Sequence, residues 1–347
     1  MKIVIFTSVL LVLFLVTPGL PQTDSLRLPG ETHLANIRQL TFGGENAEAY
    51  LSFSGDRLIF QSTRDTFACD QIFSMDLTGA GVTLQSTGTG RTTCAFYLPG
   101  DTTFIYSSTH AAGAGCPEKP DYSKGYVWPI YTSYDIYING FGATEPRILN
   151  SSTGYDAEAT VSPMGDRIIF TSSRDGDLEL YSMKIDGSDV IRLTHEIGYD
   201  GGAFYSADGK TIVYRAHHPE DSIGQADFRE LLRNGLVRPS VMELFVMNAD
   251  GSGKRQITRL NAASFAPYFH PDGQRIVFAS NMKDPRGRNF DIFLINIDGT
   301  GLEQVTVNDS FDGFPVFTAD GKKLIFSSNR NARVRGETNL FTAEWIP

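Results

Sequence analysis

Polar and cationic side chains recur at two fixed positions along the chain. The reference points are six aromatic residues that each close a short apolar stretch: Phe60, Tyr106, Phe170, Tyr214, Phe278 and Phe326. Fourteen residues before them lie Asn46, Thr92, Asp156, Asp200, Ser264 and Asp312. Four residues after them lie Arg64, His110, Arg174, His218, Met282 and Arg330. Carboxylates and cations in such an arrangement can bind a charged or polar ligand, or can pair with each other in the scaffold.

The regular recurrence of these side chains favours the scaffold role, because a residue present in every repeat usually serves the repeat itself. In the scaffold, these side chains would form ion pairs between neighbouring repeats and would cap strand ends. The alternative is a funnel for a charged or polar ligand, and it stays open. On this alternative, the candidate binding residues are Asp156, Asp200, Asp312, Arg64, Arg174 and Arg330.

Two long insertions carry further candidates for binding. Residues 109–134 hold an aromatic series among Gly and Pro: Tyr122, Tyr126, Trp128, Tyr131 and Tyr134. Residues 216–240 begin with His217 and His218, and a helix is predicted over 223–234, with Ser222 and Gln225 as a capping box and Gly235 as its stop. Exposed aromatic rings suit sugar stacking or a protein anchor, whereas the alternative is packing of both insertions over the scaffold. The candidates here are Tyr122, Tyr126, Trp128, Tyr131, His217 and His218.

Other catalytic and metal-binding patterns are weak. The six histidines are spread over repeat positions and loops, so neither a metal cluster nor another cofactor is expected. Residues 175–179 resemble a calcium loop, but Leu180 stands where the loop requires glycine, and a turn into a strand is the preferred interpretation. No G-x-S-x-G serine elbow occurs in the chain, which disfavours a serine hydrolase.

The aromatic reference points close six β-hairpins, each an apolar strand, a Gly/Asp turn and a second apolar strand, as in YLSFSGDRLIF (50–60) and VFTADGKKLIF (316–326). A third strand follows each hairpin with the pattern polar, aliphatic, aromatic, as in residues 71–73 and 179–181. After an Asp-Gly turn, a fourth strand ends in a pair such as Leu193-Thr194. The reference aromatics are 44 to 48 residues apart where no insertion intervenes, a spacing typical of four-stranded propeller blades. We therefore predict an all-β, six-bladed β-propeller.

The ends of the chain are predicted to share one blade. The sixth repeat stops after its third strand, at residues 345–347, and a spare strand occurs at residues 37–41. This N-terminal strand would complete the last blade, close the ring and remove an open sheet edge. In such a propeller both insertions lie on the face that carries the two polar columns.

The repeat S-x-D-G-K-x-I-x-F-x-S-x-R, followed by a strand, an Asp-Gly turn and "LT", resembles the PD40 repeats of TolB-like β-propellers over essentially the whole mature chain. The resemblance implies a non-catalytic binding or scaffold protein of the bacterial cell envelope, with a protein or glycan partner on the insertion face. Some related propellers cleave acidic sugars with a metal held by several histidines. The alternative is therefore a glycan-active lyase- or hydrolase-like enzyme with its site at the channel mouth.

The three cysteines are predicted to form one disulfide. Cys69, Cys94 and Cys116 all map to the same face of neighbouring blades. We prefer Cys69–Cys94 over Cys69–Cys116, although the spacing alone does not choose between them.

The N-terminal sequence indicates where the protein is located, and its net charge disfavours one class of partner. One lysine and the apolar run 3–16 precede Thr17-Pro18-Gly19, which is typical of a secretory signal, so we expect a signal peptide over 1–21 and a propeller over 33–347. The mature protein is then periplasmic or secreted, without a lipid anchor, and not integral to the membrane. A net charge of −10 argues against a nucleic-acid partner. A monomer is expected.

Overall fold

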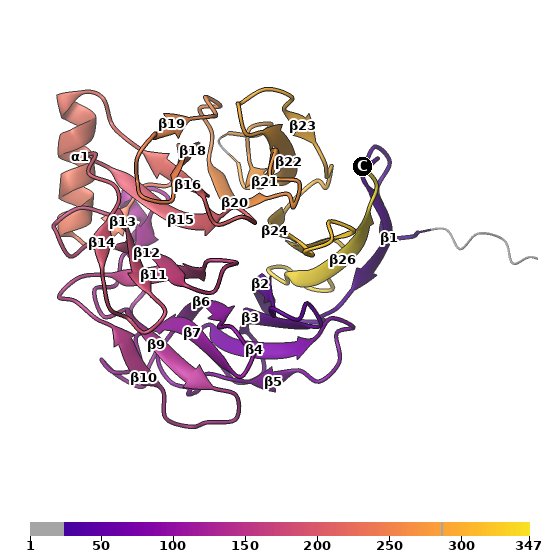
Figure 1. The fold of residues 1–347 in the computed structure, drawn as a ribbon. Helices are drawn as coiled ribbons and strands as arrows, with labels where there is room; N and C mark the ends of the chain where they lie inside the picture. Colours follow the sequence, from indigo (N-terminus) through magenta and orange to yellow (C-terminus); the bar gives the residue numbers. More distant parts are fainter. Residues whose placement is uncertain (1–23, 286) are drawn as a thin grey trace, which may run out of the picture.

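Six antiparallel sheets of four strands each surround a central axis (Figure 1), in a computed structural model that describes residues 24–285 and 287–347. The predicted all-β, six-bladed propeller is confirmed. The predicted signal peptide, residues 1–21, lies outside the described residues. Blades are numbered here from 1 to 6 in chain order.

Blades 1 to 3 follow one another along the chain. Blade 1 contains β2 (Glu45–Leu51), β3 (Arg57–Thr63), β4 (Gln71–Asp76) and β5 (Thr83–Leu84). Blade 2 contains β6 (Thr92–Tyr97), β7 (Thr103–Ser108), β9 (Asp135–Gly140) and β10 (Arg147–Asn150). Blade 3 contains β11 (Asp156–Val161), β12 (Arg167–Ser172), β13 (Glu179–Lys184) and β14 (Ile191–Arg192).

Blades 4 to 6 complete the ring. Blade 4 contains β15 (Tyr199–Tyr205), β16 (Thr211–His217), β18 (Glu243–Asn248) and β19 (Arg255–Gln256). Blade 5 contains β20 (Ser264–Phe269), β21 (Arg275–Ser280), β22 (Asp291–Asn296) and β23 (Glu303–Gln304). Blade 6 contains β24 (Asp312–Phe317), β25 (Lys323–Ser328), β26 (Asn339–Trp345) and β1 (Leu34–Gln39). The first strands of consecutive blades contact each other all around the ring, and β24 contacts β2.

The core lies between the blades and consists largely of the repeated aromatics. Each closing aromatic of the sequence pattern is fully buried. In several blades it packs on the aromatic of the third strand, with ring centroids 6.0 Å apart for Phe60 and Phe73 and 5.7 Å apart for Phe326 and Phe341. Two large rings from adjacent strands bury much apolar area, so this pair is the main hydrophobic element of the repeat.

Ring closure occurs as predicted. Strand β1 pairs antiparallel with β26, with Leu34 opposite Trp345 and Gln39 opposite Phe341. The strand begins and ends a few residues earlier than the predicted range of 37–41. The backbone N–H of Leu40 still donates to the carbonyl oxygen of Leu340 at 2.8 Å. The N-terminal strand therefore covers an edge of β26 that would otherwise be open.

The preferred disulfide, Cys69–Cys94, is wrong. Cys69 pairs with Cys116, the alternative, with their Cα atoms 6.0 Å apart, and Cys94 is a buried free thiol. Cys94 lies on the innermost strand β6 and its side chain faces the channel, away from Cys69 in the outer β3–β4 connection. The disulfide instead ties the insertion 109–134 to blade 1.

The two insertions are joined to each other. The first contains the 3₁₀ helix η1 (Tyr122–Lys124) and β8 (Trp128–Pro129), and the second contains α1 (Ser222–Arg233) and β17 (Leu236–Val237). Strands β8 and β17 form a separate antiparallel sheet, with Trp128 opposite Val237. The predicted helix is confirmed, but its N-cap is Asp221, whose side chain accepts from the backbone N–H of Gly224 at 2.7 Å, rather than Ser222.

Candidate binding cavity

The two repeated polar columns pair within single blades. Asp156 forms an ion pair with Arg174 at 2.8 Å, and Asp312 does so with Arg330 at 2.8 Å. These carboxylates are fully buried. The guanidinium of Arg174 lies 4.9 Å from the ring centroid of Tyr181, so the cation also stacks on an aromatic of its own blade. The interpretation as ion pairs between neighbouring blades is therefore wrong in its geometry, because each of these pairs joins a first-strand carboxylate to the arginine that follows the second strand of the same blade.

The other members are mixed: Asp200 and His218 also pair within one blade, whereas Asn46 donates to the carbonyl oxygen of Thr338 in blade 6 and Thr92 to that of Asp70 in blade 1. Asp200 lies 3.1 Å from the ring of His218, and burial raises the pKa of Asp200 to about 6. Arg64 lies over the ring of Phe73, 5.5 Å from its centroid. None of the described side chains of the two columns lines the cavity described below, and neither does His217. Their proposed role in binding stays a prediction, whereas their contacts place them in the scaffold.

A third column, twelve residues before each closing aromatic, turns toward the axis. Its members are Glu48, Cys94, Glu158, Gly202, Ala266 and Phe314. All six have a left-handed backbone, with φ between 47° and 57°, at a register shift between the first and second strands. Such a bulge places an additional residue in one strand and redirects its side chain. All six residues line one cavity.

This cavity has a volume of about 1010 Å³ and opens on the face that carries the insertions. Four of the predicted aromatic candidates line it: Tyr122, Tyr126, Trp128 and Tyr131. Tyr122 and Tyr126 are 54% and 50% exposed, whereas Trp128 is half-buried and Tyr134 is buried. The first insertion thus forms part of the cavity wall, and its pairing with β17 holds that wall beside the axis.

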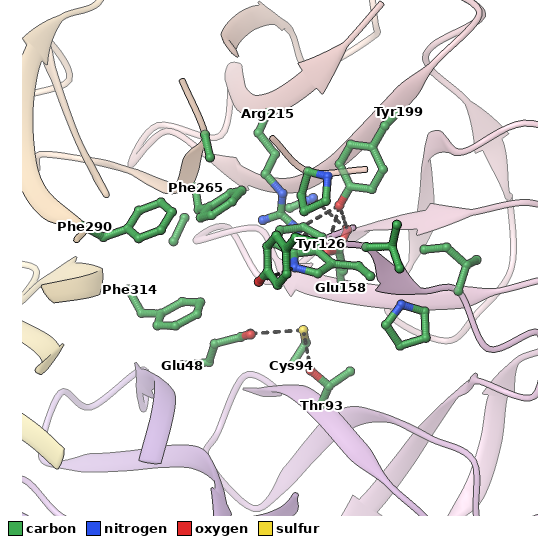
Figure 2. A pocket seen from close by; sticks show the side chains of 18 of the residues that line it. Glu48, Thr93, Cys94, Tyr126, Glu158, Tyr199, Arg215, Phe265, Phe290 and Phe314 are labelled. Carbon is green, nitrogen blue, oxygen red and sulfur yellow. Dashed lines mark hydrogen bonds and ion pairs between the residues drawn. The ribbon is translucent and has the colours of Figure 1, made fainter. Parts of the chain in front are cut away.

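The polar side of the cavity contains a buried cluster around Glu158 (Figure 2). Arg215 forms an ion pair with Glu158 and donates to the hydroxyl of Tyr199 at 2.7 Å. Tyr199 in turn donates to Glu158 at 2.8 Å. Because the neighbouring Glu158 carboxylate favours the charged form, the pKa of Arg215 is raised although burial opposes this. A Cβ on Gly202 would collide with Nη1 of Arg215, so glycine at this position leaves room for the guanidinium as it is placed here.

A second polar group surrounds Glu48. Its Oε2 accepts from the thiol of Cys94 at 3.1 Å and from the hydroxyl of Tyr50 at 3.3 Å. Burial raises the pKa of the Glu48 carboxyl, and it raises the pKa of Cys94 and of Tyr50 well above their ordinary values. Beside them, the side-chain oxygen of Gln61 accepts from the hydroxyl of Thr93 at 2.8 Å. Cys94 is thus a protonated hydrogen-bond donor at neutral pH.

The side of the cavity that adjoins Arg215 is aromatic. A chain of rings runs along it, with centroid distances of 4.9 Å from Trp128 to Phe265, 5.1 Å from Phe265 to Phe290, and 6.2 Å for both Phe290–Phe311 and Phe311–Phe314. Figure 2 shows Phe265, Phe290 and Phe314 together on one side of the polar cluster. Blades 5 and 6 supply an apolar wall, and blades 1 to 4 supply most of the polar groups.

Aromatic side chains close the channel below the cavity. Tyr50 of blade 1 and Phe204 of blade 4 meet with ring centroids 5.5 Å apart. Phe96 packs 5.0 Å from Tyr50, and Tyr268 packs 5.3 Å from Phe204. Since blades 1 and 4 stand opposite each other in a ring of six, their contact fills the axis at this level. The cavity is therefore blind at its inner end.

The sequence interpretation missed the residues at the bottom of this cavity. Glu48, Glu158 and Arg215 were not among the candidates, and Cys94 was a candidate only for a disulfide. The available signal was variation: the third column differs in residue type from blade to blade, whereas the columns that were singled out are uniformly polar or largely cationic. Positions that change between otherwise similar repeats are where an individual repeat protein can carry its own function.

Among residues 24–285 and 287–347, no group of three or more His, Cys, Asp or Glu side chains is placed to hold a metal ion. Within the same ranges, each helix is too short or too polar to cross a bilayer.

Comparisons with known proteins place the fold. Residues 238–342 match the PD40 family, described as the TolB β-propeller domain. A TolB homolog of Chlorobium chlorochromatii is 25% identical over 187 residues, 45% of this chain and 42% of the homolog. The first curated relatives are matched over 35%, 9% and 42% of their own lengths, so the matched part is less than half of each.

Solved structures resemble almost the whole chain. A putative TolB from Agrobacterium tumefaciens has a TM-score of 0.56 at 19% identity, with 90% of this chain and 97% of that chain covered. An oligogalacturonate lyase in complex with manganese has a TM-score of 0.51 at 13% identity, with 90% and 95% covered. At these identities the likeness concerns the fold, and the same fold is found in enzymes and in TolB proteins.

Proposed function

We propose that this TolB-like six-bladed β-propeller is an exported, non-catalytic binding protein of the bacterial cell envelope. A protein or glycan partner binds on the face that carries the insertions 109–134 and 216–240. The observation that supports this most strongly is the cavity itself, because the first insertion, the end of the second and the variable bulge column all contribute to its lining. Its volume of about 1010 Å³ is at the upper end of ordinary ligand sites.

The exposed rim suits contact with a large partner. Tyr122 and Tyr126 are half-exposed aromatic residues at the cavity, and the guanidinium of Arg288 lies 5.3 Å from the ring centroid of Tyr126. Aromatic rings and arginine are the side chains that most often anchor protein interfaces, and ring faces also stack on sugars. The opposite face carries short turns between the first two strands of each blade, such as residues 52–56.

Export agrees with the cysteine chemistry. A disulfide between Cys69 and Cys116 persists in an oxidising compartment such as the periplasm or the extracellular space. The same disulfide fixes one end of the aromatic insertion that forms the cavity wall. We therefore expect the oxidised protein to be the form that binds.

A glycan-active enzyme is the second candidate function, and one observation favours it. Glu48 and Glu158 line the same cavity in different surroundings, Glu158 paired with Arg215 and Glu48 with a pKa raised by burial. Two carboxyl groups held in different environments can serve as acid and base in glycan cleavage. Turnover of an oligosaccharide by the purified protein, lost in Glu48→Gln, would support this candidate.

Removing the exposed rings tests the binding function. We expect the double variant Tyr122→Ala/Tyr126→Ala to weaken retention of the envelope partner by about 10-fold or more, because losing two interface anchors typically costs at least 1.4 kcal/mol. Its melting temperature should stay close to that of the parent, since half of each ring already faces water. Binding is measured by affinity capture from solubilised envelope, followed by titration with the captured component.

A matched control is Phe53→Ala, which removes an aromatic residue that is 41% exposed in the opposite-face turn between β2 and β3. It should bind like the parent. Loss of binding in Phe53→Ala with full binding in the double tyrosine variant would contradict the proposed face.

A further inference from the structure

We propose that Glu48 recognises an organic ammonium ion at the bottom of the cavity, and that the chain of aromatic rings receives the apolar body that carries this ammonium. Because the proposal names the ligand chemistry of the cavity, it rests on the binding function proposed above. The ammonium can belong to a free amine or to a peptide, and both present the same chemistry to Glu48.

Of the two carboxylates in the described lining, Glu158 is paired with a cation and Glu48 is not. Arg215 pairs with Glu158, and Arg91 pairs with Asp70 at 2.6 Å. Within the described part of the chain, Glu48 has no ion pair, and both of its hydrogen-bond donors, the Cys94 thiol and the Tyr50 hydroxyl, reach the same oxygen, Oε2. The second oxygen, Oε1, is therefore available to a ligand. Desolvation makes the Glu48 carboxyl costly to ionise although the charge of Arg215 partly offsets this, and a ligand cation on Oε1 would favour the charged form further.

The position of Glu48 fits an ammonium with an apolar body. In the ring of bulges, its neighbours are Cys94 of blade 2 and Phe314 of blade 6, and Phe314 is the end of the aromatic chain. Ring faces attract cations, most strongly where water is excluded, and they also bury an apolar body. A ligand that places its ammonium on Oε1 of Glu48 therefore has aromatic surface directly beside it.

Other ligand classes fit the bottom of the cavity less well. An anion would meet the Glu48 carboxyl, and the guanidinium of Arg215 already serves Glu158 and Tyr199. The remaining cations of the lining, Lys119 and Arg288, are exposed at the rim, where salt screens their effect on a charge deeper in the cavity.

Binding of an ammonium should depend on pH. The ligand needs Glu48 ionised, and burial raises the pKa of this group, so affinity should fall as the pH is lowered through that raised pKa. The groups that face Glu48 do not reverse this trend. Cys94 and Tyr50 have pKa values raised well above ordinary and stay uncharged, and Arg215 stays paired with Glu158.

The test is calorimetric titration of the full protein with phenethylammonium and with phenethyl alcohol, its neutral counterpart. We expect the ammonium to bind roughly 10- to 100-fold more tightly, the usual contribution of a hydrogen bond to a charged group. Glu48→Gln should abolish this preference and leave the alcohol unchanged. Glu45→Gln removes an exposed carboxylate on the same strand β2 and should retain the preference.

Two further measurements complete the test. The pH profile of the parent requires no substitution, and a preference that does not decrease at low pH would contradict the role of Glu48. Phenylalanyl-glycinamide and its N-acetyl form separate the two sources: tighter binding of the free-amine peptide than of phenethylammonium indicates a peptide ligand, and weaker binding indicates a small amine. If the parent binds the ammonium and the alcohol equally, the proposed role of Glu48 is overturned, but the cavity can still be the binding site. If no probe binds, the cavity as the binding site is contradicted as well.

Discussion

Replacing Arg215 with methionine is expected to lower the free energy of unfolding by about 3 to 5 kcal/mol, the range for removing one partner of a buried ion pair. The side chains of Arg215 and Glu158 are only 10% and 14% exposed, so solvent screens their interaction little. Without the guanidinium, the Glu158 carboxylate would remain near the axis with only neutral donors, including the hydroxyls of Tyr199 and Thr171. Urea unfolding followed by circular dichroism measures the change.

The double variant Glu158→Gln/Arg215→Met is the control for this effect. It removes both charges, so it should be clearly more stable than Arg215→Met alone, and the two substitutions should not be additive. An Arg215→Met protein that unfolds at the parent's urea midpoint would show that the pair does not stabilise the channel.

Deleting residues 33–42 is expected to destabilise the propeller strongly. Leu34 and Ile37 are buried between β1 and its neighbours, and exposing these two side chains alone costs about 3 to 6 kcal/mol. The deletion also exposes the edge of β26 and displaces Glu31, which is fully buried and pairs with Arg330 at 2.9 Å. Thermal melting and size-exclusion chromatography should show a much lower melting temperature or association through the open edge.

A shorter deletion provides the comparison. Removing residues 24–26 keeps the whole of β1 and Glu31 and loses only local contacts, such as those of Asp24 with the backbone N–H of Ile37 and of the Leu26 carbonyl with Arg330, so its effect should be smaller. The closure scheme would be contradicted by a protein lacking residues 33–42 that melts like the parent and remains monomeric.

The repeat made the fold predictable, because each blade contributes the same physical signals. Six blades could be predicted from the closing aromatics, the Asp-Gly turns and the period of 44 to 48 residues. Ring closure could be predicted from the spare strand at the N-terminus, since a propeller without this strand would have an open sheet edge. The two polar columns were also visible in the sequence, but only their contacts show that Asp156 and Arg174 pair inside one blade.

The cavity was less predictable, because it depends on backbone geometry and on contacts between distant segments. Cys94 faces the channel and not Cys69 because a bulge in β6 changes the alternation of side chains, and simple alternation does not reveal a bulge. The pairing of Trp128 with Val237 joins insertions from two different blades, and neither two-residue strand has a recognisable pattern. Glu31 likewise reaches Arg330 only after the ring has closed.

The most direct test of the central claim, that a partner binds at the cavity on the insertion face, is site-specific photo-cross-linking in intact cells that export the protein. A benzoylphenylalanine at position 126 stands at the cavity, and one at position 53 stands on the opposite face. We predict a cross-linked product of an envelope component from Tyr126→benzoylphenylalanine and none from Phe53→benzoylphenylalanine. Cross-linking from position 53 with none from position 126 would contradict the account.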